Sequence, residues 1–177
     1  MKSMDTLIKN NSRKKQMILS AAGVIILVLI DQITKYMAQK SLRGKASFPI
    51  IKGVFELHYL ENRGSAFGLL QGQRIFFIVT AVLMLILIPY VYTKIPQGRR
   101  FYFLRVVAVM YLAGAAGNAV DRIIHGYVID FFYFSLIDFP IFNVADIYVS
   151  TATFCLIVLI LFYYKDEDFE QIHIFSK

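Results

Sequence analysis

Residues 75–92 read IFFIVTAVLMLILIPYVY and contain no charged side chain. A helix needs about 20 mostly apolar residues to cross the hydrocarbon core of a bilayer, and this run has that character. Three other segments are similar: residues 17–37, 101–120 and 147–164. Because lipid offers no hydrogen-bond partners to the backbone, all four segments are predicted to be transmembrane helices.

The composition of the whole chain agrees with a single membrane domain over residues 1–177. Apolar residues make up 58% and charged residues 18%, against roughly 45–50% and 25% in soluble domains. The net charge is +7, and the basic residues lie mainly between the apolar segments. This pattern indicates membrane topology and contact with anionic membrane lipids, and it argues against nucleic acid as a partner.

Four spans place both termini on one side of the membrane. Lys and Arg are more frequent in the two tails and in the 94–105 linker than in the other two connections, and Arg13–Lys15 lies directly before the first span. Both termini are therefore predicted to be cytoplasmic, with residues 165–177 as a charged, partly disordered tail. Residues 17–30 lack a small-residue cleavage site, so we interpret them as part of a retained span.

The connections suggest what lies on the other side. Residues 38–74 form a long loop in which Val54–Leu60 alternates like a strand, whereas residues 121–146 are rich in aromatic side chains that suit an interface or a lid. The predicted fold is an all-α membrane bundle of four transmembrane helices with a small extracytoplasmic β-sheet and loop cradle. Ala113 and Gly117, four residues apart, predict a close helix contact.

Polar side chains at membrane depth need a reason. By topology, the ends of spans 17–37 and 101–120 and the start of span 147–164 share one face of the membrane. Separate parts of the chain therefore deliver carboxylates and amides to one layer. The polar residues of this layer are Asp31, Lys35, Asn62, Arg63, Asn118, Asp121, Arg122, Asp130, Asn143 and Asp146.

Several of these residues also have purely structural interpretations. Asp31 and Lys35 have the i, i+4 spacing of an ion pair, and Asn62–Gly64 has the composition of a turn. The helix end at Asn118 and Asp121–Arg122 is compatible with a simple Asp–Arg contact.

The last two acids differ in how easily a structural role explains them. Asn143 and Asp146 have the spacing of a helix cap and a first-turn acid. Asp130 is harder to explain in this way. It lies between Val128-Ile129 and Phe131-Phe132, and an acid in such surroundings needs partners or a task.

Other catalytic groups are not arranged for chemistry. The histidines are far apart in the sequence, Cys155 lies alone in an apolar run, and neither a zinc-protease motif nor a phosphate-binding loop is present. Carboxylates therefore remain as the candidate reactive groups, and no metal or other cofactor is predicted.

Five blocks in order resemble the lipoprotein signal peptidase family, also called signal peptidase II. They are DQITK at 31–35, NRGSAFG at 62–68, GNAVDR at 117–122, VIDF at 128–131 and FNVAD at 142–146. Each block alone is a weak signal, but five in sequence on four spans are highly specific. The resemblance covers roughly residues 25–160 and leaves the two tails outside.

The resemblance implies an aspartic endopeptidase whose catalytic pair is Asp130 and Asp146. It assigns supporting or substrate-binding roles to Asp31, Lys35, Asn62, Gly64, Asn118, Asp121, Arg122, Asn143 and Ala145. The implied substrate is a prolipoprotein whose cysteine carries diacylglycerol, cut just before that cysteine. The implied location is the bacterial cytoplasmic membrane, with the site on the extracytoplasmic side. We expect the protein to work as a monomer.

Two other functions use the same polar layer. A small transporter would place carboxylates deeper in the spans and often shows a repeat between halves, neither of which is visible. A metal-dependent phosphotransferase would bind a divalent ion through Asp121, Asp130 and Asp146.

Overall fold

The computed structural model describes residues 2–64 and 71–172, with side chains from Asn10 onward. Residues 65–68 of the NRGSAFG block and residues 173–177 of the tail lie outside the described residues. Within this part of the chain, four helices are long and apolar enough to cross a membrane. They span Asn10–Leu42, Arg74–Lys94, Arg99–Ile124 and Val144–Tyr163, so the predicted four-helix membrane bundle is confirmed.

The helices extend beyond the predicted segments. α1 covers Lys2–Leu42, α2 covers Arg74–Lys94, and α3 covers Tyr102–Ile124 after a short 3-10 turn, η2, at Arg99–Phe101. α4 covers Val144–Val158 and continues as a π-helical turn, η4, at Leu159–Tyr163. α1 runs through Asp31 and Lys35 without a break, because these polar residues find buried partners instead of ending the span.

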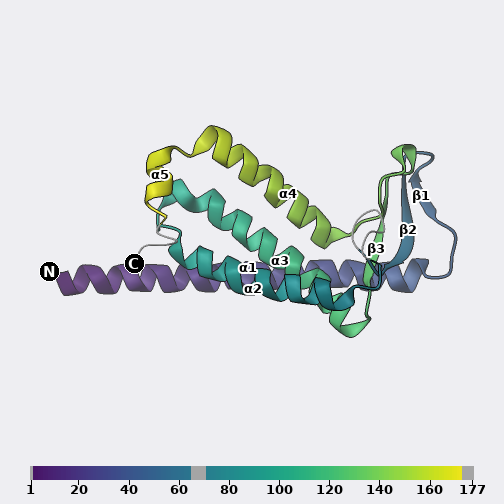
Figure 1. The fold of residues 1–177 in the computed structure, drawn as a ribbon, viewed down its shortest axis with the longest axis horizontal. Coiled ribbons are helices and arrows are strands. Elements are labelled where there is room, and N and C mark those ends of the chain that lie inside the picture. Colours follow the sequence, from purple (N-terminus) through teal and green to yellow (C-terminus); the bar gives the residue numbers. More distant parts are fainter. Residues whose placement is uncertain (1, 65–70, 173–177) are drawn as a thin grey trace.

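α3 lies at the centre of the bundle and packs against α1, α2 and α4. Its buried residues include Val107, Ala113 and Gly117, whereas α2 has no buried residue at all. The outward-facing apolar side chains of α1, α2 and α4 are exposed and suit contact with lipid. Figure 1 shows α1 along the whole length of the molecule, with the sheet at one end and the start of α1 at the other.

Small residues let α3 approach its neighbours closely, as predicted. Ala113 is fully buried. A Cβ added to Gly114 would lie 2.5 Å from Val149 Cγ2 on α4, and one added to Gly117 would lie 2.5 Å from Asp31 Oδ2 on α1. Both positions therefore exclude any side chain larger than hydrogen unless neighbours move.

A three-stranded antiparallel sheet, in the order β1-β2-β3, covers one end of the bundle (Figure 1). β1 is Phe48–Ile51 and β2 is Phe55–Asn62, so the strand predicted at 54–60 is present. β3, Val128–Tyr133, was not predicted. Its first four residues are all buried, so the alternation of apolar and polar residues that usually reveals a strand is missing.

The aromatic segment that contains β3 was predicted to suit an interface or a lid, which stays a prediction, and part of the segment packs on the sheet. Phe132 stacks against Phe55 of β2, Phe134 packs on the same ring at a tilt, and Phe142 contacts Phe132. The amides of Phe131 and Phe132 both donate to the carbonyl of Phe142. This short pairing holds the start of α4 beside β3.

The described part of the C-terminal tail contains an ordered element, and the predicted partial disorder of residues 165–177 stays a prediction. Residues Asp166–Glu170 form a short helix, α5, at the end of the molecule opposite the sheet (Figure 1). Arg100 Nη2 lies 2.7 Å from Asp168 Oδ2, and the Arg100 guanidinium stacks over the Tyr163 ring at 4.2 Å. The tail is therefore held against the start of α3.

Gly117→Ala tests the tight approach of α3 to α1. The added methyl must displace the Asp31 carboxylate, so we expect a loss of about 1–3 kcal/mol in stability, measured by thermal unfolding in detergent. Gly23→Ala is the matched control, because a Cβ there would meet only Val109 Cγ1 at an ordinary 3.5 Å. Equal melting temperatures for Gly117→Ala and wild type would contradict the packing described here.

Candidate active site

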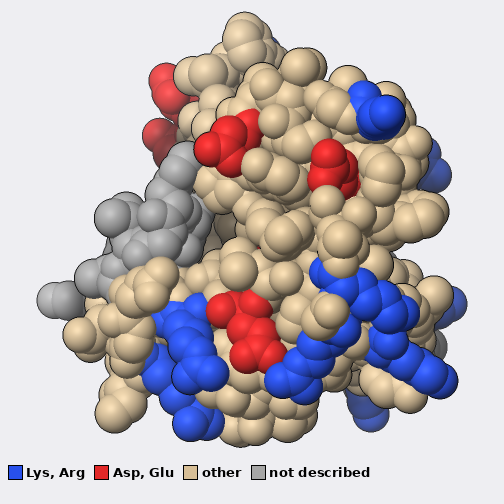
Figure 2. Space-filling model, turned by 90° about the vertical axis from the view of Figure 1, so that its right-hand side faces the viewer, with Lys and Arg blue, Asp and Glu red and all other residues tan. Residues whose placement is uncertain are grey.

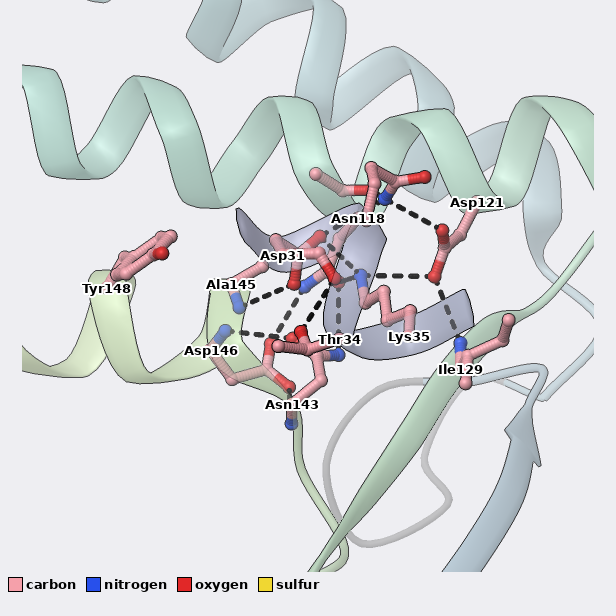
Figure 3. A network of polar contacts seen from close by, with 12 residues as sticks. Asp31, Thr34, Lys35, Asn118, Asp121, Ile129, Asn143, Ala145, Asp146 and Tyr148 are labelled. Atoms are coloured by element: carbon pink, nitrogen blue, oxygen red, sulfur yellow. Dashed lines mark hydrogen bonds and ion pairs between the residues drawn. The ribbon is translucent and has the colours of Figure 1, made fainter. Parts of the chain in front are cut away.

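All but one of the polar residues singled out in the sequence come together where the helices meet the sheet. The exception is Arg63, whose side chain is exposed and lies near Glu61 and the Tyr127 ring. The others are brought from five elements: Asp31 and Lys35 from α1, Asn62 and Gly64 from the end of β2, Asn118, Asp121 and Arg122 from α3, Asp130 from β3, and Asn143, Ala145 and Asp146 from the start of α4. Figure 3 shows most of this network, with the side chains of α1, α3 and α4 pointing toward one another.

Lys35 lies at the base of the site and is 1% exposed. Its ammonium contacts Asp31 Oδ2 at 2.9 Å, Asp121 Oδ2 at 3.0 Å and Asn118 Oδ1 at 2.9 Å. An ammonium has three hydrogens, so these three acceptors use all of them. The i, i+4 pair predicted for Asp31 and Lys35 is therefore present, but it is buried rather than interfacial.

Asp31 and Asp121 tie this base to neighbouring elements. Asp31 Oδ1 accepts a hydrogen bond from the Ala145 amide at 2.9 Å, which joins α1 to the first turn of α4. Asp121 Oδ2 accepts from the Ile129 amide at 3.0 Å, which joins α3 to β3. The Asp121–Arg122 contact that we considered is replaced by the Asp121–Lys35 pair (Figure 3).

Asp130 is 1% exposed on β3 and is held by two amide side chains. Asn143 Nδ2 donates to its Oδ1 at 2.6 Å, and Asn62 Nδ2 donates to its Oδ2 at 2.8 Å. Burial, and next the negative charge of Asp146, raise the pKa of Asp130 to about 7, against the lowering effect of these hydrogen bonds. A carboxyl of this kind keeps its proton to a much higher pH than an ordinary aspartate and is only partly ionised at neutral pH.

Asp146 occupies the first turn of α4 and is part of a capping box. The Asn143 side chain accepts from the Asp146 amide at 3.1 Å, and the Asn143 amide donates to Asp146 Oδ2 at 3.2 Å. The other oxygen, Oδ1, accepts from Asn118 Nδ2 at 2.7 Å. The interpretation of Asp146 as a first-turn acid of the helix is therefore correct. The same carboxylate also lines a cavity.

Asn143 connects the two carboxyl groups. It is fully buried, its Nδ2 contacts both Asp130 Oδ1 and Asn118 Oδ1, and its backbone amide contacts Asp146. One residue therefore fixes the relative position of two acids from different elements.

Both acids line one cavity of about 720 Å³. Arg122 also lines it, with its guanidinium 4.5 Å from the centre of the Phe77 ring and its Nη2 donating to the Gly64 carbonyl at 3.1 Å. The cavity continues into the bundle between three helices. Its walls there include Phe77, Thr80 and Met84 of α2, Gly114 and Ala115 of α3, and Ile147, Ser150 and Thr151 of α4.

Sequence reasoning missed the residues of α2. Met84 lies in an apolar run, which gives no sign of which side chains face the cavity and which face lipid. Thr80 is the hydroxyl-bearing exception within this run, and that exception was the available signal for a cavity-facing position. Gln32 was also missed, although its amide donates to Asp121 Oδ1 at 3.0 Å. Its place directly after Asp31, at the polar end of the span, was the available signal.

The family model described as Signal peptidase (SPase) II matches residues 23–162. The chain belongs to the signal peptidase II family. Among similar proteins, the lipoprotein signal peptidase of Caldanaerobacter subterraneus subsp. tengcongensis is 42% identical over 78% of this chain and 93% of its own length. The lipoprotein signal peptidase of Clostridium tetani is 36% identical over 86% of this chain and 97% of its length.

Solved structures agree with membership of the signal peptidase II family. A bacterial membrane enzyme structure obtained by the in meso method at 2.3 Å resolution has a TM-score of 0.74 and 32% identity, covering 81% of this chain and 87% of that chain. A second such structure, at 1.9 Å resolution, has a TM-score of 0.73 and 31% identity, covering 82% of this chain and 94% of that chain.

Membership of the signal peptidase II family identifies the chain as a peptidase and does not support the transporter or phosphotransferase functions. The geometry agrees. Asp121 Oδ1 is bonded to Gln32, and Oδ2 is shared by Lys35 and the Ile129 amide. This carboxylate is therefore not free to join Asp130 and Asp146 around a cation.

Proposed function

We propose that Asp130 and Asp146 are the catalytic pair of an aspartic endopeptidase that removes signal peptides from diacylglyceryl-modified prolipoproteins. The observation that carries this proposal is the placement of a buried carboxyl group from β3 and a half-buried one from α4 on one cavity wall, with Asn143 touching both. The names of the relatives supply the substrate class.

Proton sharing explains why two acids are needed. Two carboxyl groups in one poorly solvated site do not both ionise easily, so the pair holds a single proton near neutral pH. The ionised member accepts a proton from water as that water attacks the scissile carbonyl. The protonated member donates a hydrogen bond to the developing oxyanion, and a proton then passes to the leaving amine. This chemistry needs no cofactor.

The shape of the cavity supports a membrane-embedded substrate cut just before its lipidated cysteine. A signal peptide is itself an apolar helix, and the cysteine that follows it lies at the bilayer surface. The catalytic pair lies where the helices meet the sheet, while the cavity continues between α2 and α4 along apolar side chains. One cavity therefore offers polar groups for the scissile bond and an apolar wall for the rest of the substrate.

The supporting residues fall into three groups. Asn62, Asn118 and Asn143 hold the catalytic carboxyl groups by direct hydrogen bonds. Arg122 and Gly64 line the cavity and are placed to contact the substrate backbone. Asp31, Lys35, Asp121 and Ala145 lie behind the pair and support it.

The protein is a multi-pass protein of the bacterial membrane, and we propose the following orientation. The sheet end faces the extracytoplasmic side; Figure 2 looks onto this end, where charged side chains suit contact with water. The opposite end carries a group of basic residues, which suits the anionic lipids of the cytoplasmic leaflet. They are Arg13–Lys15, Lys94 and Arg99–Arg100. We expect the enzyme to act as a monomer in contact with membrane lipids.

Cysteine labelling tests this orientation. In a Cys155→Ser background, Lys52→Cys on the sheet end should react with a membrane-impermeant maleimide added to intact cells. Asp166→Cys in α5 should react only after the membrane is opened. The opposite pattern would contradict the orientation.

Isosteric substitutions test the catalytic pair. Asp130→Asn and Asp146→Asn keep the size of each side chain and an oxygen that accepts hydrogen bonds, but they abolish the shared proton. We expect cleavage of a lipidated prolipoprotein by the purified enzyme to fall at least about 10³-fold in kcat, as when members of other catalytic constellations are removed. Thermal unfolding should show that both variants fold.

Asp121→Asn is the matched control, because it changes a buried aspartate behind the pair. We expect a graded loss of activity in this variant. Near-normal turnover by Asp130→Asn or Asp146→Asn would overturn the assignment.

A further inference from the structure

We propose that Lys35 is a positioning residue that sets the direction of the amide side chains of Asn118 and Asn143, so that both present N–H groups to the catalytic carboxyl groups. This inference rests on the proposed function and assigns a task to a side chain that does not line the cavity. Hydrogen bonds lead outward from the ammonium to Asn118, and from Asn118 to Asn143 and Asp146 (Figure 3).

The first step is the contact between Lys35 and Asn118. An amide side chain has an accepting end and a donating end of nearly the same shape, so its direction depends on its neighbours. Lys35 Nζ is a pure donor and lies 2.9 Å from Asn118 Oδ1. A reversed Asn118 would place its N–H₂ against the ammonium, where no acceptor exists. The Asn118 N–H₂ group is therefore directed to Asp146 Oδ1, 2.7 Å away.

The second step is the contact between Asn118 and Asn143, which determines the direction of the Asn143 amide. Asn118 Oδ1 also accepts from Asn143 Nδ2 at 3.1 Å, and the same Nδ2 donates to Asp130 Oδ1 at 2.6 Å. Asn143 Oδ1 faces the Asp146 amide, which agrees with this direction. The Lys35 ammonium thus sets the direction of two amide side chains. Asn118 donates to Asp146, and Asn143 donates to Asp130.

Lys35 is suited to this task because it is itself held in place. It is 1% exposed, and its two carboxylate partners, Asp31 and Asp121, are each at most 1% exposed. The charged groups around the site are Asp31 on the same helix, Asp121 and Arg122 on α3, Asp130 on β3 and Asp146 on α4. The positive charge of Lys35 also lowers the pKa of Asp130. Removal of this charge should therefore change the pH dependence of activity as well as kcat.

The test must separate positioning from simple charge balance. Lys35→Met alone leaves Asp31 and Asp121 without their counter-charge, and breaking a buried pair is strongly destabilising. We therefore compare Asp121→Asn with the double variant Lys35→Met/Asp121→Asn. The double variant keeps the wild-type net charge of the Asp31–Lys35–Asp121 group, and Asp31 keeps its hydrogen bond from the Ala145 amide.

The expected result is a further loss in the double variant. Relative to Asp121→Asn, kcat for a lipidated prolipoprotein should fall about 10- to 100-fold, as for other residues that orient catalytic groups, with a smaller change in KM. The high-pH limb of the activity profile should also move upward, because the pKa of Asp130 rises when the positive charge is lost. Lys40→Met, an exposed position on the same helix, should change neither quantity.

If Lys35 serves only as the counter-ion of Asp121, the double variant and Asp121→Asn will have the same kcat, which would overturn the proposal. If instead wild type itself fails to cleave the lipidated substrate, the proposed function fails and not merely the role of Lys35. The two failures are therefore distinguishable.

Asn118→Asp tests the direction of the Asn118 amide in a way that does not depend on folding of the double variant. It keeps an oxygen on Lys35 but replaces the N–H₂ that faces Asp146 with a second oxygen. We expect at least about a tenfold loss of kcat at neutral pH, partly recovered at lower pH as the new carboxyl gains a proton and can donate it to Asp146. Wild-type activity at neutral pH in this variant would show that the direction of the amide is irrelevant.

Discussion

Burial of several carboxyl groups around one ammonium is the constraint on which the rest of this structure depends. Asp31, Asp121, Asp130 and Asp146 come from four different elements, and the first two share the ammonium of Lys35. Isolated charges in such buried surroundings would strongly destabilise the folded protein. The partners that make them tolerable also determine where α1, α3, β3 and α4 lie relative to one another.

The close packing of the bundle follows from this constraint. Asp31 reaches the Ala145 amide only because Gly117 leaves room for its carboxylate between α1 and α3. Asp121 in turn anchors β3 through the Ile129 amide. The base of the site is therefore cross-linked between α1, α3, β3 and α4, and the cavity lies beside it.

Much of this arrangement was predictable from the sequence. Apolar runs long enough to span a bilayer indicated the four helices, and polar residues at their matching ends indicated the site. The roles of individual residues were harder to predict, because one residue can have a structural role and a chemical role at the same time. Asp146 is both a capping residue and a cavity-lining acid, and no pattern in the sequence separates the two.

Other features were hidden for physical reasons. β3 is buried on both faces at Val128–Phe131 and so lacks the alternation that exposes a strand. α2 is apolar on nearly all sides, so cavity-facing side chains such as Met84 became visible only from packing. The Lys35–Asp121 pair joins residues 86 positions apart, and spacing rules for a single helix do not reach that far.

The pH dependence of kcat/KM for the wild-type enzyme on a lipidated prolipoprotein tests the central claim most directly. With both acids protonated there is no base, and with both ionised there is no acid, so a pair that shares one proton gives a bell-shaped profile. Because burial and the charge of Asp146 raise the pKa of Asp130 to about 7, the falling limb should lie near neutral pH. A rate that rises through about pH 4 to a plateau, as for an independent carboxylate, would contradict the account.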